Sequence, residues 1–528
     1  MGLLGLFNFA ERGLFANAAI VLVTLLCVYG YAAKKIHPKE PAVVAPRVPF
    51  VGHLIGMATQ GGRYVKNLGL AHKHMPIFTL PVPRSRIYIV TDPWLAAVVQ
   101  RASKSLSFTP LVPDITERVL GLDKRTVEIV RQNLDPLPGE ERGFLADIHD
   151  MLYTYLGPGE ALNDMSCAAT QELYEQLGDY MKRLHKKKGQ SEVVDLLGWV
   201  RHFVAAGTAK FLYGPNNPFE IDAKLEEAFW DFDHGLGGLL MGIFPSLTAA
   251  KAYNGREKLA RALKEYLEAG HEKEASRIVQ SRIRIAKDYD WTLDMTARSE
   301  LSFLFAGIVN TATTLFWIIL QISARPKLLA QIQSELKEAK LSSERTTGAG
   351  TLSMNAVREK SPTLVAVFRE CLRVGSENFS TRLVKEDTML ADQYFLRKDS
   401  VVQIAGSVIH SDGGIWGDDV AEFNPDRFLQ ASRDGKSNFH PAAFRAFGGG
   451  KTLCPGRHFA TNEIVMLAAL MILSFEFSAP GGGQISVPKK NDAIMPVHIL
   501  EPLTREPVKI NVKLREEATE TMKWRVAL

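Results

Sequence analysis

The sequence predicts a mainly α-helical protein with a smaller β part. Three observations lead to this expectation. Most of residues 160–325 has helical periodicity, a long apolar segment runs without proline up to Pro326, and short β-type runs and turns dominate beyond Ser376. IFTLPV and RIYIVT are expected to form a strand pair, followed by a helix in PWLAAVVQRAS. A final helix, roughly over residues 456–473, precedes a strand-rich tail.

The N-terminal part predicts one transmembrane helix. From Gly13 to Ala33 the chain has 21 residues without a charge, enough for a helix to span about 30 Å, and two lysines follow at once. We therefore expect a short segment over 1–13, an anchor over 14–33, a proline-rich hinge over 34–60 and a catalytic domain over 61–528. The basic residues after the anchor favour a single-pass protein with its long C-terminal part in the cytosol. We expect the membrane to be that of the endoplasmic reticulum. A cleaved signal peptide is the alternative.

Composition and charge exclude some functions. The 528 residues carry a net charge of +5, and the basic residues form no long run, so nucleic acid is not an expected partner. The four cysteines form no CxxC pair and are too few for a disulfide framework. A reducing compartment is therefore expected, in which one cysteine could still serve as a ligand or nucleophile.

The segment that ends before Pro326 predicts a helix from about Asp294 to Arg325. Its middle, LSFLFAGIVNTATTLFWIILQI, is apolar almost all round, which is typical of a helix that crosses the core of a domain. A membrane span is the competing interpretation. The polar residues at its centre, from Asn310 to Thr314, argue for the core.

The chemistry is indicated by FGGGKTLCPGRHFA, residues 447–460. A phosphate-binding loop would need a glycine where Arg445 stands, and Cys454 with His458 would give a zinc ion only two ligands. A small buried thiol is the ordinary role of a cysteine. A haem-thiolate loop explains more of the segment, since glycines allow the tight turn around the sulfur and the helix that follows directs its positive end toward a thiolate.

Four of these residues, Phe447, Gly450, Cys454 and Gly456, stand in the order F-x-x-G-x-x-x-C-x-G. This pattern resembles the haem-binding loop of the cytochrome P450 superfamily. The resemblance implies the fold of that family, haem b as cofactor, and Cys454 as the axial ligand to the haem iron.

Further motifs lie upstream in the order that the family requires. Glu370 and Arg373 match its E-x-x-R helix, and FNPDRF resembles the segment that brings a second arginine, here Arg427, onto the same glutamate. In the family this network is structural. Arg382 stands where the family places a strand arginine that faces a haem propionate. An ordinary surface ion pair would be the alternative for Glu370 and Arg373.

The chain departs from the family in its oxygen-binding groove. Val309 occupies the position of the usual acid and Asn310 that of the usual threonine, with Thr311 one residue further on. Asparagine at this position resembles the branch of sterol 7α-hydroxylases, sterol 12α-hydroxylase and prostacyclin synthase. We expect Asn310 to position a bound water or a substrate oxygen, with Thr311 as a second hydroxyl. The alternative is that Asn310 only satisfies a backbone carbonyl in a distorted helix.

Two usual partners of the haem propionates are also missing. Thr452 replaces the arginine that commonly stands two residues before the cysteine, and the W-x-x-x-R pattern of another helix is absent. Lys124 and Arg125 are the candidates that remain for this role.

The resemblance implies a monooxygenase that inserts one atom of O₂ into a lipophilic substrate such as a sterol, terpenoid or other secondary metabolite. Electrons would come from NADPH through a membrane-bound NADPH-cytochrome P450 reductase, for which Lys451, Arg457 and His458 could form part of a docking face. One alternative is a peroxide isomerase or dehydratase that needs no reductase. The other is a haem-binding sensor or carrier without turnover.

Overall fold

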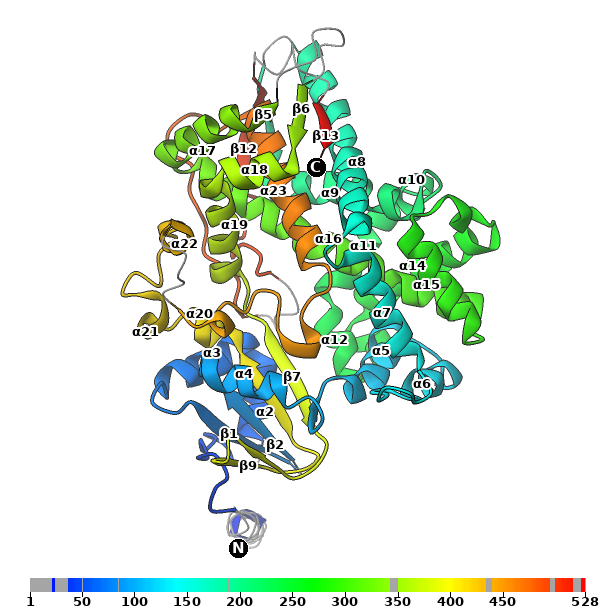
Figure 1. The fold of residues 1–528 in the computed structure, drawn as a ribbon, viewed down its shortest axis with the longest axis vertical. Coiled ribbons are helices and arrows are strands. Elements are labelled where there is room, and N and C mark those ends of the chain that lie inside the picture. Colours follow the sequence, from blue (N-terminus) through cyan, green and yellow to red (C-terminus); the bar gives the residue numbers. More distant parts are fainter. Residues whose placement is uncertain are drawn as a thin grey trace, which may run out of the picture.

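The computed structural model describes residues 21–23, 37–49, 51–83, 85–187, 190–341, 350–433, 439–493, 499–515 and 524–527. Helices dominate these segments; the largest sheet lies at the lower end in Figure 1, and small sheets lie at the upper end. The mainly helical fold class is thus confirmed. Of the predicted anchor over 14–33, only residues 21–23 are described; they are helical and exposed. The rest of that prediction lies outside the described residues.

The largest sheet has five strands in the order β1-β2-β10-β7-β3. Its strands are β1 Ile77–Val82, β2 Ser85–Val90, β3 Leu106–Ser107, β7 Phe379–Val384 and β10 Val401–Ala405. The first two form the predicted antiparallel pair, whereas β10 runs parallel to β2 and antiparallel to β7. Strand β7, which contains Arg382, follows the helical part of the chain and leads from it into the sheet (Figure 1).

The other strands form three small sheets, in the orders β11-β12-β4, β13-β6-β5 and β8-β9. Their bounds are β4 Glu192–Asp195, β5 Lys340–Leu341, β6 Gly350–Ser353, β8 Thr388–Leu390, β9 Tyr394–Leu396, β11 Phe475–Ser478, β12 Lys509–Leu514 and β13 Trp524–Ala527. The strand-rich character expected beyond Ser376 is therefore present in the described part of that region.

Most helices pack into one body above the sheet (Figure 1). The helices up to Tyr213 are α2 Gly52–Gln60, α3 Gly62–Ala71, α4 Pro93–Arg101, α5 Val112–Leu120, α6 Lys124–Arg131, α7 Phe144–Leu156, α8 Glu160–Lys186 and α9 Leu196–Tyr213, with the 3₁₀ turn η1 Thr109–Leu111. The next are α10 Pro218–Ile221, α11 Lys224–His234, α12 Leu236–Met241, α13 Pro245–Thr248, α14 Ala250–Glu268, η2 His271–Glu274, α15 Arg277–Asp288 and α16 Leu293–Ser323. The last are α17 Pro326–Ala339, α18 Met354–Lys360, α19 Pro362–Gly375, α20 Gly406–His410, α21 Gly413–Trp416, α22 Asp426–Arg433, η3 Pro441–Ala443, η4 Gly450–Thr452 and α23 Arg457–Ser474.

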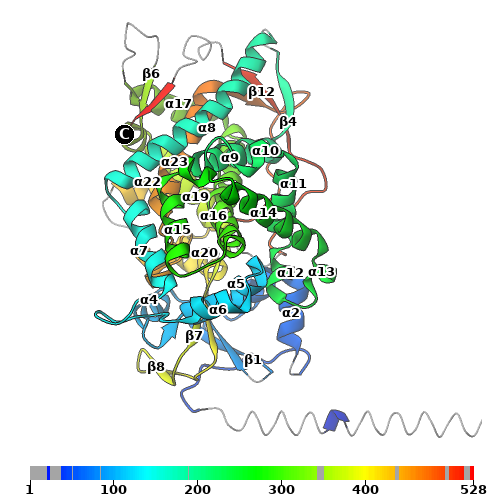
Figure 2. The ribbon, with the colours of Figure 1, turned by 90° about the vertical axis from the view of Figure 1, so that its right-hand side faces the viewer.

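Helix α16 is the predicted long apolar helix. The side chain of Thr292 caps its first turn by accepting a hydrogen bond from the backbone N–H of Met295, and Pro326 begins the next helix. Within the described residues, α16 alone is long and apolar enough to cross a membrane, yet 72% of its most apolar stretch is buried inside the protein. The core interpretation therefore holds, and α16 passes through the middle of the helical body (Figure 2).

The segment predicted as a stiff hinge is folded onto the sheet. Val43 forms a parallel bridge with Thr79 of β1, and the backbone groups of Val44 and Ala42 exchange hydrogen bonds with Thr79. Residues 52–60 form α2, in which the buried His53 donates from Nε2 to Val44 O at 2.9 Å and forms a second hydrogen bond between Nδ1 and the Tyr64 hydroxyl at 2.8 Å. The expectation of an extended connector is therefore wrong for residues 52–60, which are helical, whereas Ala42–Val44 are bridged to the sheet through partners that the proline content does not reveal.

Candidate functional site

The loop before α23 is shaped by its glycines. Gly448 and Gly450 both have positive φ, at 75° and 63°, which side chains other than glycine rarely adopt. A Cβ atom on Gly450 would lie 3.0 Å from the Cβ atom and carbonyl oxygen of Gln100 on α4, so the loop also passes very close to that helix. The backbone N–H of Cys454 then donates to Phe447 O at 2.9 Å and closes the turn.

Cys454 lies at the end of this turn, three residues before α23 begins. The Tyr153 hydroxyl of α7 donates to the carbonyl oxygen of Leu453 at 3.1 Å and holds the loop from the side of the helical body. Burial raises the pKa of the Cys454 thiol, while the Gly456 N–H and the Arg457 guanidinium act in the opposite direction. The half-buried sulfur thus lies at the end of the turn, with the Gly456 N–H directed at it.

A cavity of about 320 Å³ separates this loop from α16. On one wall it contains Cys454 together with Phe447 and Gly456, three of the four residues of the predicted loop motif. On the other walls apolar side chains predominate; they include Leu152, Met165, Phe211, Phe303, Phe459 and Ile499. An enclosed, mostly apolar space with few polar groups is the usual character of a small-molecule site.

The α16 wall of the cavity carries both residues predicted from the oxygen groove. Asn310 lines the cavity, and its Oδ1 accepts a hydrogen bond from the backbone N–H of Ile499 at 3.1 Å. The amide oxygen therefore accepts from a backbone N–H of a distant segment, which differs from the bond to a backbone carbonyl that was the alternative for this residue. The Asn310 NH₂ group is the part left to bind a water or a substrate. Thr311 also lines the cavity, and its Oγ1 donates to Glu463 Oε2 on α23 at 3.2 Å.

Glu463 was not among the residues singled out from the sequence. It is 1% exposed, it lines the same cavity, and burial raises the pKa of its carboxyl group to about 8 although the Thr311 hydroxyl acts to lower it. Glu463 lies in the predicted final helix, nine residues after Cys454, and no sequence motif singled it out as a functional residue. Its pairing with Thr311 joins two helices that lie far apart in the sequence.

Two buried arginines lie beside the loop. Arg382 of β7 donates to Gly449 O at 3.2 Å and to the Thr452 hydroxyl, and Arg445 donates to the Ser380 hydroxyl at 3.0 Å. The side-chain amide of Gln100 is oriented with its oxygen toward Arg445, and this oxygen also accepts hydrogen bonds from the Arg445 guanidinium group.

Burial lowers the pKa of both guanidinium groups to about 10, and for Arg445 the nearby charge of Arg382 adds to this effect. Neither forms an ion pair with a carboxylate in the described part of the chain, and Arg445 Nε has no hydrogen-bond partner there. Two like charges buried side by side in this way are costly unless an anionic group joins them. Arg445 was missed from the sequence because it stands outside the expected motif positions.

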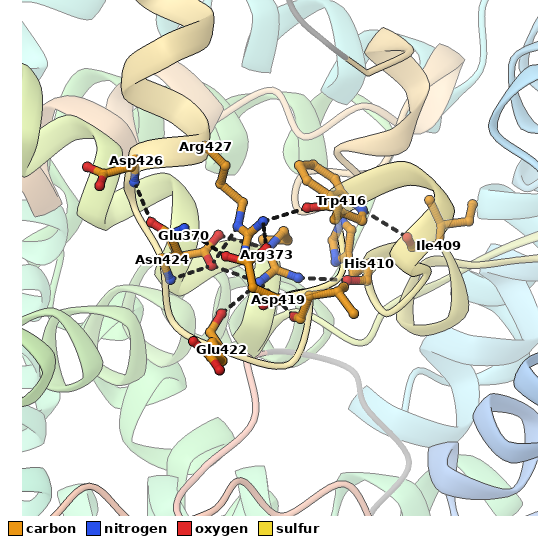
Figure 3. A network of polar contacts seen from close by, with 11 residues as sticks. Glu370, Arg373, Ile409, His410, Trp416, Asp419, Glu422, Asn424, Asp426 and Arg427 are labelled. Carbon is orange, nitrogen blue, oxygen red and sulfur yellow. Dashed lines mark hydrogen bonds and ion pairs between the residues drawn. The ribbon is translucent and has the colours of Figure 1, made fainter.

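The structure brings together the predicted glutamate and both of its arginines (Figure 3). Glu370 accepts hydrogen bonds from Arg373 Nε at 2.8 Å and Nη2 at 2.7 Å, both within α19, and from Arg427 Nε at 3.2 Å. The backbone N–H of Asn424 adds a fourth at 3.0 Å. The Glu370 and Arg373 side chains are almost fully buried, so the network is not the surface pair that the spacing alone would allow.

Other sequence candidates lie away from the cavity. Lys124 and Arg125 are exposed on α6, and they lack the hydrogen bonds to the cysteine loop that Arg382 has, so the expectation that they replace missing propionate partners has no support in their positions. Only their positive charge had suggested these two residues as propionate partners. Lys451 is exposed at the surface beside the loop, with its ammonium 4.0 Å from Asp135, while Arg457 and His458 are half-buried at the start of α23.

Comparison with known proteins places the chain in a family. The family model for cytochrome P450 matches residues 169–499. The chain is similar to the cytochrome P450 monooxygenase nodJ of Hypoxylon pulicicidum, with 30% identity over 89% of this chain and 90% of that protein. It is also similar to mouse cytochrome P450 7B1, with 25% identity over 88% and 90%, and to the cholesterol 7-alpha-monooxygenase of Cricetulus griseus, with 29% identity over 47% and 51%.

The helical fold and a cavity closed by a cysteine loop define a haem-thiolate class of protein. The chain belongs to the cytochrome P450 family and is an oxidoreductase of the monooxygenase type, whose members bind haem through a cysteine thiolate. The residues present fit that cofactor. Cys454 offers a thiol on the cavity wall, and the two unpaired arginines offer positive charge to the haem carboxylates.

Proposed function

We propose that this chain hydroxylates or otherwise oxidises a lipophilic sterol, terpenoid or related secondary metabolite with O₂ and electrons from NADPH. The observation that carries the proposal is the largely apolar cavity that has Cys454 in one wall and α16 in the other. Haem with a thiolate ligand supplies the reductive activation of O₂ in this family. The walls of the cavity supply binding and orientation, since apolar side chains hold a lipophilic molecule and exclude bulk water.

We assign the cofactor contacts of this chain to particular residues. Cys454 is the proposed axial ligand, in a loop formed by Phe447, Gly450 and Gly456. Arg382 and Arg445 would pair with the haem propionates; Arg445 would take the place of the arginine that Thr452 replaces. The support is their burial without a carboxylate partner among the described residues. Glu370, Arg373 and Arg427 are proposed to fix the core around α19 and not to take part in chemistry.

Two resemblances support a sterol as the substrate class. The asparagine in the oxygen groove resembles the sterol-hydroxylase branch, and one relative is named for cholesterol. The relative with 30% identity is named only as a monooxygenase, so a sterol and a terpenoid are both retained as substrate classes.

Membrane attachment is proposed from the apolar segment over 14–33 and from exposed apolar side chains on the folded part. Leu54 and Ile55 of α2 are exposed, as are Ile243, Phe244 and Leu247 around α12 and α13, with Phe244 and Leu247 more than 70% exposed. Figure 2 shows α2, α12 and α13 along the same edge of the molecule. Exposed apolar clusters of this kind are typical of surfaces that contact lipid or another protein. The proposed anchor precedes α2 in the sequence, which supports a membrane contact at α2.

The proposed electron donor is a membrane-bound NADPH-cytochrome P450 reductase, because the sequence has no dinucleotide-binding fingerprint of its own. Purified full-length protein in detergent should show shifts of the Soret band with cholesterol or with geranylgeraniol, a sterol and a diterpene alcohol. Whichever compound binds should then be converted to product, and this conversion should require both reductase and NADPH. Conversion of a lipid hydroperoxide without reductase would favour the isomerase alternative, and binding without any turnover would contradict the proposal.

A further inference from the structure

A second cavity, of about 500 Å³, lies at the surface between α10, α11 and α14 and shares no residue with the catalytic cavity beside Cys454. Apolar groups form most of the surface of this second cavity; they include Ile221 of α10, Leu225 of α11 and Ala262 of α14. Leu225 is buried and Ile221 is 65% exposed, so the apolar surface extends from the interior of the cavity to its edge. Cavities of this size and character are typical of small-molecule sites.

Basic side chains from two helices surround this apolar surface. Lys224 belongs to α11, whereas Lys258 and Arg261 lie one turn apart on α14, and all three residues are exposed. The ion pairs of α14 within the described part of the chain involve residues such as Arg256 and Lys264, and none involves these three side chains. Positive groups that have no counter-charge and stand beside apolar surface are complementary to an amphiphilic anion.

Two carboxylates also line the surface cavity, but they do not cancel its positive charge. Asp222 Oδ1 accepts a hydrogen bond from the backbone N–H of Lys224 at 3.0 Å, at the start of α11. Glu265 lies one turn after Arg261 on α14 and is exposed. With His271 neutral, the three cations that line the cavity exceed its two carboxylates by one charge. A ligand with a single negative charge, such as a carboxylate, matches this excess.

A chain of buried contacts connects the surface cavity with the catalytic cavity. Tyr266, in the wall of the surface cavity, donates from its hydroxyl to the carbonyl oxygen of Tyr213 on α9 at 2.8 Å. The Tyr213 hydroxyl lies 3.0 Å from the carbonyl oxygen and 3.1 Å from Oε2 of Glu300 on α16, to which it donates. Glu300 Oε1 accepts from Arg282 Nε of α15 at 2.9 Å. The Arg282 guanidinium lies over the ring of Phe303, 4.6 Å from its centroid, and Phe303 lines the catalytic cavity.

The burial of this chain couples its members. Tyr266, Tyr213, Glu300 and Arg282 are each at most 6% exposed. A buried polar group is costly to leave unpaired, so a displacement of one member obliges its partner to follow. A ligand that packs against Tyr266 therefore acts on the position of Phe303, an aromatic part of the catalytic wall.

We propose that the surface cavity binds a small carboxylic acid with an apolar tail, and that its occupancy changes ligand affinity in the catalytic cavity through the buried chain from Tyr266 to Phe303. The carboxylate pairs with Lys258 and Arg261, while the tail covers Ile221. The acid comes from solution and not from a lipid headgroup, because α10 lies above α12 and α13, the helices proposed to contact the membrane (Figure 2). Binding of the acid involves no turnover, so it is independent of the proposed reaction.

Calorimetric titration of octanoate into the full-length haem protein in phosphatidylcholine nanodiscs tests the surface cavity, with empty nanodiscs as the blank. Octanoate should bind, and acetate and octanamide, which lack the tail or the charge, should bind roughly tenfold more weakly or less. The double variant Lys258→Gln with Arg261→Gln should weaken octanoate binding by roughly the same factor. Lys251→Gln, an exposed lysine of the same helix outside the cavity, should match wild type. Octanoate binding that is absent in wild type, or unchanged in the double variant, would overturn the inference.

The coupling is measured with 1-phenylimidazole, a haem ligand whose binding in the catalytic cavity shifts the Soret band. Saturating octanoate should change the dissociation constant of 1-phenylimidazole by roughly fivefold or more, and saturating 1-phenylimidazole should change that of octanoate by the same factor. Tyr213→Phe removes the hydroxyl that joins α9 to Glu300, so octanoate should still bind while the coupling factor falls toward one.

Tyr180→Phe is the matched control for Tyr213→Phe. The buried Tyr180 hydroxyl on α8 has no hydrogen-bond partner among the described residues and is not part of the chain, so this variant should keep the wild-type coupling factor. A coupling factor of one in wild type, or equal factors in wild type and Tyr213→Phe, would overturn the proposed link between the two cavities.

Discussion

Replacing Glu370 by alanine removes the acceptor at the centre of the network in Figure 3. Four hydrogen bonds are lost: two from Arg373, one from Arg427 and one from the Asn424 N–H. Arg427 keeps Asp419 as a counter-charge at 2.9 Å, whereas Arg373 keeps backbone carbonyl oxygens such as that of His410. The loss of one partner from a buried pair costs about 3–5 kcal/mol, so Glu370→Ala should lower the free energy of unfolding by about that amount.

Urea unfolding followed by far-ultraviolet circular dichroism, together with haem content per chain, measures this effect. Glu359→Ala on the neighbouring α18 is the matched control; its side chain is exposed, and the change should stay within about 0.5 kcal/mol. A double variant, Glu370→Leu with Arg373→Met, removes both charges and should be more stable than Glu370→Ala, because an apolar pair leaves less buried charge uncompensated. Full haem loading and unchanged stability in Glu370→Ala would refute the reasoning.

Three further changes test other parts of the account. Removal of residues 1–33 should shift much of the protein from the membrane pellet to the supernatant and leave the CO spectrum intact; loss of haem would show that the domain begins earlier. Asn310→Ala should lower the product formed per NADPH and leave the Ile499 N–H without its acceptor, at about 1 kcal/mol of stability; Asn310→Asp keeps that acceptor, and a wild-type product yield per NADPH in Asn310→Ala would remove the residue from the mechanism. Arg445→Met should speed transfer of haem to apomyoglobin by roughly tenfold, the equivalent of one charge-assisted hydrogen bond, and an unchanged rate would exclude Arg445 as a propionate partner.

The parts of the site that could be predicted from the sequence depend on short spacings. Glu370 and Arg373 are three residues apart in one helix, and the turn before Cys454 is formed by its own glycines. Helix α16 was predictable for the same reason, since its apolar residues and its cap are contiguous in the chain. In each case the local sequence contains most of the groups that determine the geometry.

The parts that could not be predicted depend on contacts between distant segments. Glu463 meets Thr311 only because α23 and α16 pack together, and Asn310 meets the Ile499 N–H across a similar separation in the sequence. Arg445 becomes unusual only when the fold buries it beside Arg382. The hinge was misjudged for the same reason: prolines indicate an extended backbone, but not that Thr79 of β1 will bond to it.

The most direct test of the central claim is the reduced-plus-CO difference spectrum of the full-length protein and of Cys454→Ser. The account predicts a thiolate-type Soret band in the wild type and its loss in the variant, while the far-ultraviolet circular dichroism remains that of a folded, mainly helical chain. A thiolate-type band that persists in Cys454→Ser would contradict the assignment of Cys454 as the haem ligand.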